Sequence, residues 1–321
     1  MKSTLYRPDL VVEKILLLDG LSRAGKFLLG KVVSNFQKVE FFQSAVILEH
    51  LPILRYLGVI DTPEAISYFR LNLNMYIYER AIGRNLNTRP SDGSSITNST
   101  EYELYIQRMS RPDGIESVNE LIEDQRLPSF LTHECMSQID FFLEACPDFQ
   151  MINIQRHPID LVASWFLRGW GERWGNDPLA FIPVVKNLQN GLPWFVEDWK
   201  DEYNKMSPID RCIKSICTMY NLDQTVYSNF KDKEKYILLI CYEDFFSRPD
   251  YVIGQIMEFI GRSPFVNMKA VLQREGCPKE ISLKKRRENY NIIRSLGNFE
   301  LVEQLLVLSI EYEKQWGLNS F

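Results

Sequence analysis

The stretch that decides the fold is ILLLDGLSRAGKFLLGKVV, residues 15–33. Its first four residues are apolar, which is typical of a strand buried on both faces. Gly20 and Gly25 then frame a short turn, and the apolar residues that follow recur with helical spacing. A strand that ends in a glycine turn and feeds a helix directs backbone N–H groups at the helix N-terminus, where anions bind. The stretch therefore predicts an anion-binding loop.

Two basic residues strengthen this prediction. Arg23 and Lys26 lie within the same turn, where their charges would attract a phosphate or sulfate oxygen. In a nucleotide triphosphatase the residue after the lysine is a serine or threonine whose hydroxyl binds magnesium, but here it is Phe27. The turn is thus suited to an anion held without a metal ion. The alternative, which the turn alone leaves open, is a plain strand–turn–helix with its basic side chains in water.

The rest of the chain repeats this order of strand, turn and helix. Apolar strand candidates span residues 14–18, 150–155 and 236–242, with a weaker one at 129–132. Helical patterns cover residues 136–145, 158–167, 209–230, 249–260 and 298–316. Strands that alternate with helices indicate βα units around a parallel sheet. We therefore predict an α/β, three-layer, P-loop-like fold with a central parallel sheet flanked by helices.

The amino-acid composition limits the class of protein and the partners that it can have. The 321 residues are 45% apolar, enough for a substantial core, and 37 basic against 42 acidic residues give a net charge of −5. The net charge of such a chain gives no positive electrostatic field that would attract nucleic acid or an anionic membrane. Any anion site must therefore be local. With no signal-peptide pattern and no apolar run of about 18 residues, we expect a cytoplasmic protein without a membrane span. The six cysteines are scattered singly, which predicts buried thiols rather than disulfides or a metal site.

No repeat or linker divides the chain, so we predict a single domain over residues 1–321 with two loop insertions. Residues 82–100 are polar and long enough for a lid or a disordered excursion. Residues 169–191 contain Trp170 and Trp174 among several glycines and prolines. With Trp194 and Trp199 these rings would either build a stacking wall for an acceptor or belong to the core.

A second segment adds another anion-binding pattern. FQMINIQRHPIDLVASWFLRGW, residues 149–170, places Arg156 directly after an apolar strand and Ser164 on the helix that follows. Ligands bind at the carboxyl ends of the strands in open α/β sheets, and a guanidinium with a nearby hydroxyl can hold one phosphate there. The alternative is a salt bridge from Arg156 to Asp160, with Ser164 a passive helix residue.

Together with YILLICYEDFFSRPDYVIGQIMEFIG, residues 236–261, these segments resemble the sulfotransferases that use 3′-phosphoadenosine 5′-phosphosulfate (PAPS). The family's first loop is similar to residues 16–29 here. Its second signature is similar to Arg156, Pro158, Asp160 and Ser164. Its third, a strand ending in Tyr-Glu-Asp before a helix and Phe-x-Gly, is similar to residues 236–261. The three occur in the family's order, between about residue 14 and about residue 290.

The resemblance implies a donor site and a reaction. It implies that Arg156 and Ser164 hold the 3′-phosphate and that the 5′-phosphosulfate lies on Leu21, Ser22, Arg23, Ala24, Gly25, Lys26 and Phe27. The sulfuryl group would pass in line, without a metal ion, to a hydroxyl of a carbohydrate, lipid or small-molecule acceptor, and the product would be PAP. Arg23 or Lys26 would stabilise the leaving group. The residues indicate no particular oligomeric state.

A base must take the proton of the acceptor hydroxyl. His133, in SFLTHECMSQ at residues 129–138, is similar to a catalytic histidine that some family members have in a Lys-Thr-His context, although Leu131 replaces the lysine. Glu134 is an alternative base, as are the acids Glu49 and Glu79, and a purely structural histidine is a third possibility. Of the two other histidines, His157 is expected to line a turn and His50 to be half-buried.

A basic run near the C-terminus, LKKRREN at residues 283–289, occupies the place of a family loop that closes over the 3′-phosphate. Lys285, Arg286 and Arg287 are therefore candidate phosphate ligands, and a solvated helix face is the plain alternative. Glu243 and Asp244 are expected to be structural rather than catalytic.

Two other functions stay open at this point. A P-loop kinase using ATP and magnesium is opposed by Phe27 and by a strand that ends at Arg156 instead of a metal-binding aspartate. A non-catalytic nucleotide-binding relative is kept open by Leu131.

Overall fold

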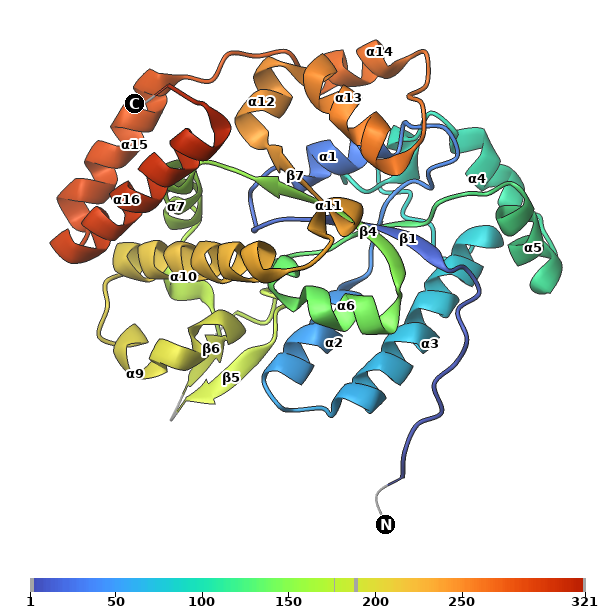
Figure 1. Cartoon of the computed structure of the whole chain (residues 1–321), viewed down its shortest axis with the longest axis horizontal. Coiled ribbons are helices and arrows are strands. Elements are labelled where there is room, and N and C mark those ends of the chain that lie inside the picture. Colours follow the sequence, from blue (N-terminus) through green and yellow to red (C-terminus); the bar gives the residue numbers. More distant parts are fainter. Residues whose placement is uncertain (1–2, 176, 188–189, 320–321) are drawn as a thin grey trace. The chain divides into compact units, whose positions relative to one another are not determined.

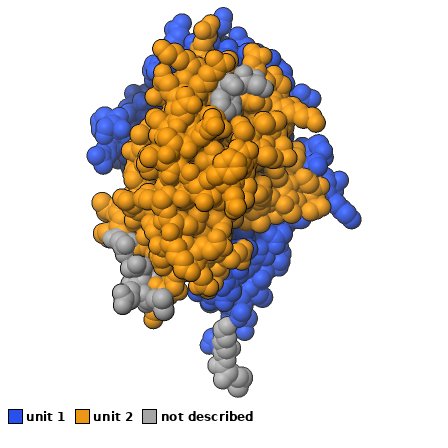
Figure 2. All heavy atoms as spheres, turned by 90° about the vertical axis from the view of Figure 1, so that its left-hand side faces the viewer, with its two compact units in different colours: residues 1–154, 231–240, 244–279 blue, residues 155–230, 241–243, 280–321 orange. Residues whose placement is uncertain are grey.

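A computed structural model of the chain describes residues 3–175, 177–187 and 190–319. It contains two compact units, which Figure 2 colours separately. Unit 1 comprises residues 1–154, 231–240 and 244–279, and unit 2 comprises residues 155–230, 241–243 and 280–321. A single sulfotransferase-like domain remains a prediction. In the part of the chain that the structure describes, no helix is both long and apolar enough to cross a membrane.

A central five-stranded sheet has the strand order β2-β3-β1-β4-β7 (Figure 1). β1 pairs in parallel with both β3 and β4, and Leu17 lies opposite Phe130 on one side and Met151 on the other. The pairing of β2 with β3 is also parallel. The strands are β1 (Lys14–Asp19), β2 (Gln43–Ser44), β3 (Ser129–Leu131), β4 (Asp148–Gln155) and β7 (Ile237–Cys241). The predicted α/β fold with a central parallel sheet is confirmed.

The hydrophobic effect places β1 at the centre of this sheet. Its residues Ile15, Leu16, Leu17 and Leu18 are 0% exposed. Each such side chain contributes about 1.5–3 kcal/mol when it is fully buried. In Figure 1, α2, α3 and α6 lie below the sheet, whereas α1, α13 and α14 lie above it, so helices flank the strands as predicted.

The helices of unit 1 are α1 (Lys26–Val33), α2 (Val46–Tyr56), α3 (Thr62–Ala81), η1 (Ile96–Asn98), α4 (Tyr102–Arg108), α5 (Ile115–Glu123), η2 (Met136–Gln138), α6 (Ile139–Ala145), α11 (Lys233–Tyr236), α13 (Pro249–Ile260) and α14 (Met268–Arg274). A further helix, α12 (Tyr242–Ser247), includes residues of both units.

Unit 2 is built on α7 (Pro158–Phe166), which packs against α10 (Pro208–Asn229), α15 (Leu283–Leu296) and α16 (Phe299–Trp316). It also contains α8 (Trp170–Arg173), η3 (Trp194–Trp199), α9 (Lys200–Tyr203) and an antiparallel hairpin of β5 (Val184–Asn187) and β6 (Asn190–Pro193). Pro158 and Pro208 each stand at the first position of a helix, where the missing N–H costs no hydrogen bond.

Most predicted elements are confirmed to within a few residues, and the helix ends at Gly261 and Gly317 are left-handed caps. The short edge strand β2 was not predicted. The first three residues of the predicted helix 136–145 form a 3₁₀ turn, and the predicted strand 236–242 is too long because Tyr242 begins α12. All six cysteines are buried thiols outside any disulfide, as predicted.

The two irregular segments have structure of their own. In residues 82–100, Asn87 donates to Ser94, and Asn98 donates to the carbonyl of Asp92, so the loop is internally hydrogen-bonded. In the second segment Trp174 contacts both Trp165 and Trp170 edge to face. Trp174, Trp194 and Trp199 are at most 8% exposed and belong to the core, so they do not form an open acceptor wall.

Candidate functional site

The predicted anion loop, residues 20–25, follows β1 and leads into α1. Gly20 has φ of 143°, and a Cβ atom there would lie 2.4 Å from the carbonyl oxygen of Ile154, so only glycine is accommodated. Arg23 and Gly25 both have left-handed backbones, with φ of 75° and 109°. These two reversals bring the chain directly into the first turn of α1, where Lys26 is the first helical residue.

Lys26 lies inside the loop that precedes it. It is 4% exposed, and its Nζ donates to the carbonyl of Gly20 at 2.5 Å. Burial lowers the pKa of Lys26, and the carboxylates of Glu134, Asp19 and Glu49 oppose this shift. Arg23, by contrast, is exposed. The loop therefore has one buried cation and one cation at the surface.

The end of β3 lies beside this loop. Because β1 and β3 are parallel neighbours, their carboxyl ends meet at one edge of the sheet. The backbone N–H of Thr132 donates to Leu18, and that of Glu134 donates to Gly20 at 3.3 Å. Residues 132–134 are therefore joined to the loop.

Glu134 contacts the anion loop directly. Its Oε1 accepts a hydrogen bond from the backbone N–H of Ser22 at 2.8 Å. The backbone of Glu134 is left-handed, with φ of 55°, which turns its side chain back toward the loop. An anionic oxygen thus already occupies one N–H of the loop, and a phosphate or sulfate oxygen would compete for the same donor.

Asp19, the last residue of β1, organises this edge and was missed by the sequence analysis. Its carboxylate accepts hydrogen bonds from the Thr132 hydroxyl, the Asn153 amide and the backbone N–H groups of Cys135 and Met136. It is fully buried, so these bonds replace its hydration. The available signal was a single carboxylate at the end of an otherwise apolar strand.

His133 forms a pair with Glu49 of α2. Its Nδ1 lies 2.9 Å from Glu49 Oε2, and the two side chains are 29% and 9% exposed. Burial raises the pKa of Glu49 to about 8, whereas burial and the positive charge of Lys26 lower the pKa of His133. The pair therefore holds its imidazole in place and leaves Nε2 for another partner. The alternative acid Glu79 instead accepts from Asn85 at the end of α3.

In unit 2, Arg156 follows β4 and has a fixed backbone. Its N–H donates to the hydroxyl of Tyr220 at 3.2 Å, and that hydroxyl donates in turn to the carbonyl of Arg156. The guanidinium carbon lies 4.7 Å from the centre of the Tyr242 ring. Ser164 is half-buried on α7, at the distance of about two helical turns along the sequence from Arg156. Asp160, the predicted alternative partner of Arg156, accepts from Nε of Arg286.

The basic run at residues 283–289 divides into two environments on α15. Arg286 is 1% exposed and pairs with Asp160 at 3.0 Å and with Glu243 at 3.1 Å. Lys285 and Arg287 are exposed. The run is therefore neither a uniformly solvated face nor a uniform set of phosphate ligands, because its central arginine already compensates two carboxylates.

Glu243 has a structural role, as expected, because its carboxylate is hydrogen-bonded to several parts of unit 2. Its carboxylate accepts from the backbone N–H of His157, from Arg286 and from the hydroxyl of Tyr312 at 2.6 Å. These bonds join residues 157 and 243 to α15 and α16 within unit 2. Burial and the positive charges of Arg286 and Arg156 lower the pKa of His157 to about 2, so this histidine stays neutral.

No protein-family model and no curated protein matches the sequence. Solved sulfotransferase structures are similar to it. One is the sulfotransferase domain from the curacin biosynthetic pathway, at 13% identity over 84% of this chain and 79% of that chain, with a TM-score of 0.45. Another is the sulfotransferase domain from the Synechococcus PCC 7002 olefin synthase, at 14% identity over 100% and 99% of the two chains, with a TM-score of 0.45.

A third is a sulfotransferase from Mycobacterium avium, at 12% identity over 96% of this chain and 78% of that chain, with a TM-score of 0.48. Because these identities are so low, the function of this chain has to be argued from its own residues. Across residues 3–175, 177–187 and 190–319, no three His, Cys, Asp or Glu side chains are grouped to hold a metal ion.

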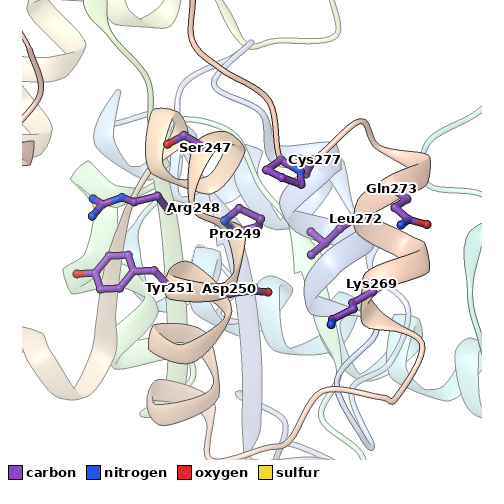
Figure 3. A pocket seen from close by; sticks show the side chains of 10 residues that line it. Ser247, Arg248, Pro249, Asp250, Tyr251, Lys269, Leu272, Gln273 and Cys277 are labelled. Carbon is purple, nitrogen blue, oxygen red and sulfur yellow. The ribbon is translucent and has the colours of Figure 1, made fainter.

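A pocket of about 350 Å³ lies between α13 and α14 of unit 1, with Leu272 pointing toward Pro249 and Lys269 toward Asp250 (Figure 3). None of its lining residues is among the predicted site residues. At its edge Arg248 pairs with Asp244 at 2.8 Å. Asp244 therefore anchors the start of α13, in agreement with its expected structural role.

Proposed function

We propose that this protein is a PAPS-dependent sulfotransferase that moves a sulfuryl group to a hydroxyl of a carbohydrate, lipid or small-molecule acceptor. The observation that supports this most is the meeting of the anion loop and His133 at one edge of the sheet. A group bound on the loop would then lie beside a neutral imidazole whose Nδ1 is already held by Glu49. That is the arrangement that transfer of an anionic group to a hydroxyl requires.

The loop residues would hold the 5′-phosphosulfate. Its backbone N–H groups can bind anionic oxygens, as the bond from Ser22 to Glu134 illustrates. Lys26, buried beside them, would neutralise charge that develops on the oxygen bridging sulfur and phosphorus. From the family resemblance we assign the 3′-phosphate to Arg156 and Ser164, with Lys285 and Arg287 as further candidates.

In the transfer step the acceptor oxygen forms a bond to sulfur while the bridging S–O bond breaks and its electron pair leaves with PAP. The acceptor proton passes to Nε2 of His133. Glu49 is a positioning residue in this scheme, since it accepts from Nδ1–H and so keeps the lone pair on Nε2. No step needs a hydroxyl at the position of Phe27.

The His133–Glu49 pair predicts a pH dependence. Nε2 accepts a proton only after the pair has released the proton that it shares, and burial sets the pKa of Glu49 at about 8. Lys26, His50 and Asp19 are the other titratable groups around Glu49. Below that pH, kcat should therefore rise about tenfold per pH unit, and above it kcat should become constant.

Glu49→Gln tests this origin of the pH profile. The amide oxygen can still accept from Nδ1–H but takes up no proton, so Nε2 keeps its lone pair and the rise of kcat across neutral pH should disappear. The measurement is kcat against pH, at saturating donor, for both proteins. An unchanged slope in the variant would assign the titration to another group.

Thermal unfolding with ligands tests the proposed function itself. A ligand that binds only the folded state raises Tm, by an amount that grows with its concentration above Kd. PAP without magnesium should raise Tm, and ATP with magnesium should have a much smaller effect. The opposite order would favour the kinase. Stabilisation by PAP without turnover on any acceptor class, assayed with labelled PAPS, would favour the non-catalytic relative.

A further inference from the structure

Unit 1 contains a buried cluster of charges that the proposed reaction does not use. Glu40, which is 1% exposed, accepts from both terminal nitrogens of Arg108 at 2.7 and 2.9 Å. Its Oε1 also accepts from Nε of Arg126, whose own Nη2 donates to Glu101 at 2.6 Å. The nearby positive charge, chiefly that of Arg108, lowers the pKa of Glu40 to about 2 against the effect of burial. Glu40 is therefore ionised at neutral pH.

Arg80, at the end of α3, is the cation of this cluster that lacks a carboxylate partner among the described residues. It is 5% exposed, and neither Nε nor Nη1 has a hydrogen-bond acceptor. Nε of Arg108 is likewise buried and without an acceptor. Both guanidinium carbons lie 5.2 Å from the centre of the Tyr105 ring. The two arginines thus contact one ring, and three of their buried nitrogens, with four N–H bonds between them, lack a hydrogen-bond acceptor.

The charges of the cluster do not balance. Arg80, Arg108 and Arg126 carry three positive charges, whereas Glu40 and Glu101 carry two negative ones. A guanidinium does not lose its proton in a protein, so Arg80 cannot relieve the excess by becoming neutral. The carbonyl ends of α3 and α4, where Arg80 and Arg108 lie, offset part of it. An unpaired buried charge with unsatisfied donors is nonetheless costly.

We propose that a small monatomic anion, chloride in a cell, binds at the Arg80–Arg108–Tyr105 cluster and supplies the missing negative charge. The unsatisfied donors are N–H groups on three guanidinium nitrogens, and a monatomic anion can accept from any of them because it has no preferred direction of its own. A tetrahedral oxyanion would need donors matched to its four oxygens, more than these buried nitrogens can supply. The inference is independent of the proposed transferase activity.

Chloride dependence of stability provides the first test. At constant ionic strength, with sodium gluconate replaced by sodium chloride, Tm of the wild type should rise by about 2 °C for each tenfold increase in chloride above Kd. Arg80→Met removes the charge and its donors, so its Tm should be independent of chloride. The matched control is Arg84→Met, which removes an exposed arginine paired with Asp113 at 3.1 Å and should keep the wild-type slope.

Crystals soaked in sodium bromide provide a test that does not depend on the variants folding. An anomalous peak within hydrogen-bond distance of Nε or Nη1 of Arg80 is expected in the wild type. A water molecule only, a bound oxyanion from the buffer, or a wild-type Tm indifferent to chloride would each overturn the proposal. So would an Arg80→Met protein that is more stable than the wild type at every chloride concentration, since that is the behaviour of an arginine with no counter-ion.

Discussion

Replacing His133 with alanine should lower kcat by about 10²- to 10⁴-fold, the usual contribution of a general base, while PAP still raises Tm as in the wild type. The imidazole is neutral because burial and Lys26 lower its pKa, and its Nδ1 is held by Glu49 at 2.9 Å. Removing the ring removes the proton acceptor but none of the proposed donor ligands. Turnover with labelled PAPS and thermal unfolding with PAP measure the two effects separately.

Two carboxylate variants serve as controls for this result. Glu134→Gln keeps an oxygen that can accept from the Ser22 N–H, so its turnover should fall far less than that of His133→Ala. Glu79→Gln should behave as the wild type, because Glu79 contacts Asn85 away from His133. Loss of turnover in Glu134→Gln together with normal turnover in His133→Ala would transfer the role of base to Glu134.

The first half of the site could be predicted from sequence because it depends on short segments. An apolar strand, two glycines and an apolar helix are sufficient to specify residues 15–33. Residues 129–133 then needed only one further assumption, that β3 is the parallel neighbour of β1. The sequence analysis did not predict this pairing, and the structure shows it, with Leu18 opposite Leu131. Because parallel strands end at the same edge, the loop and His133 had to be close.

Other parts of the site depend on packing that no local pattern reveals. Glu49 lies 84 residues before His133, and only the packing of α2 brings the two together. The buried face of α15 carries Arg286, Asn289 and Ile293, of which two are polar. Hydrophobic periodicity therefore could not distinguish Arg286 from its exposed neighbours Lys285 and Arg287. Tyr220, which fixes the backbone of Arg156, is likewise 64 residues away in sequence.

Replacing Arg156 with alanine should weaken PAP binding by about 2–5 kcal/mol, or about 30- to 5,000-fold in Kd, because a phosphate would lose a charge-assisted fork of donors. The backbone at this position is held by Tyr220 and should not move. Isothermal titration with PAP and with adenosine 5′-phosphate gives the relevant comparison. If Arg156 contacts only the 3′-phosphate, the variant should lose affinity for PAP and keep its affinity for adenosine 5′-phosphate.

Two further variants of this region distinguish a specific contact from a general charge effect. Arg156→Lys retains the charge but not the planar fork, so its affinity for PAP should lie between those of the wild type and the alanine variant. Tyr242→Phe keeps the ring that stacks on the guanidinium and should bind PAP normally. If Arg156→Ala lost the same affinity for PAP and for adenosine 5′-phosphate, the arginine would act on the fold or on the 5′ end of the ligand. Unchanged PAP binding would place the 3′-phosphate on other residues, with Lys285 and Arg287 the next to test.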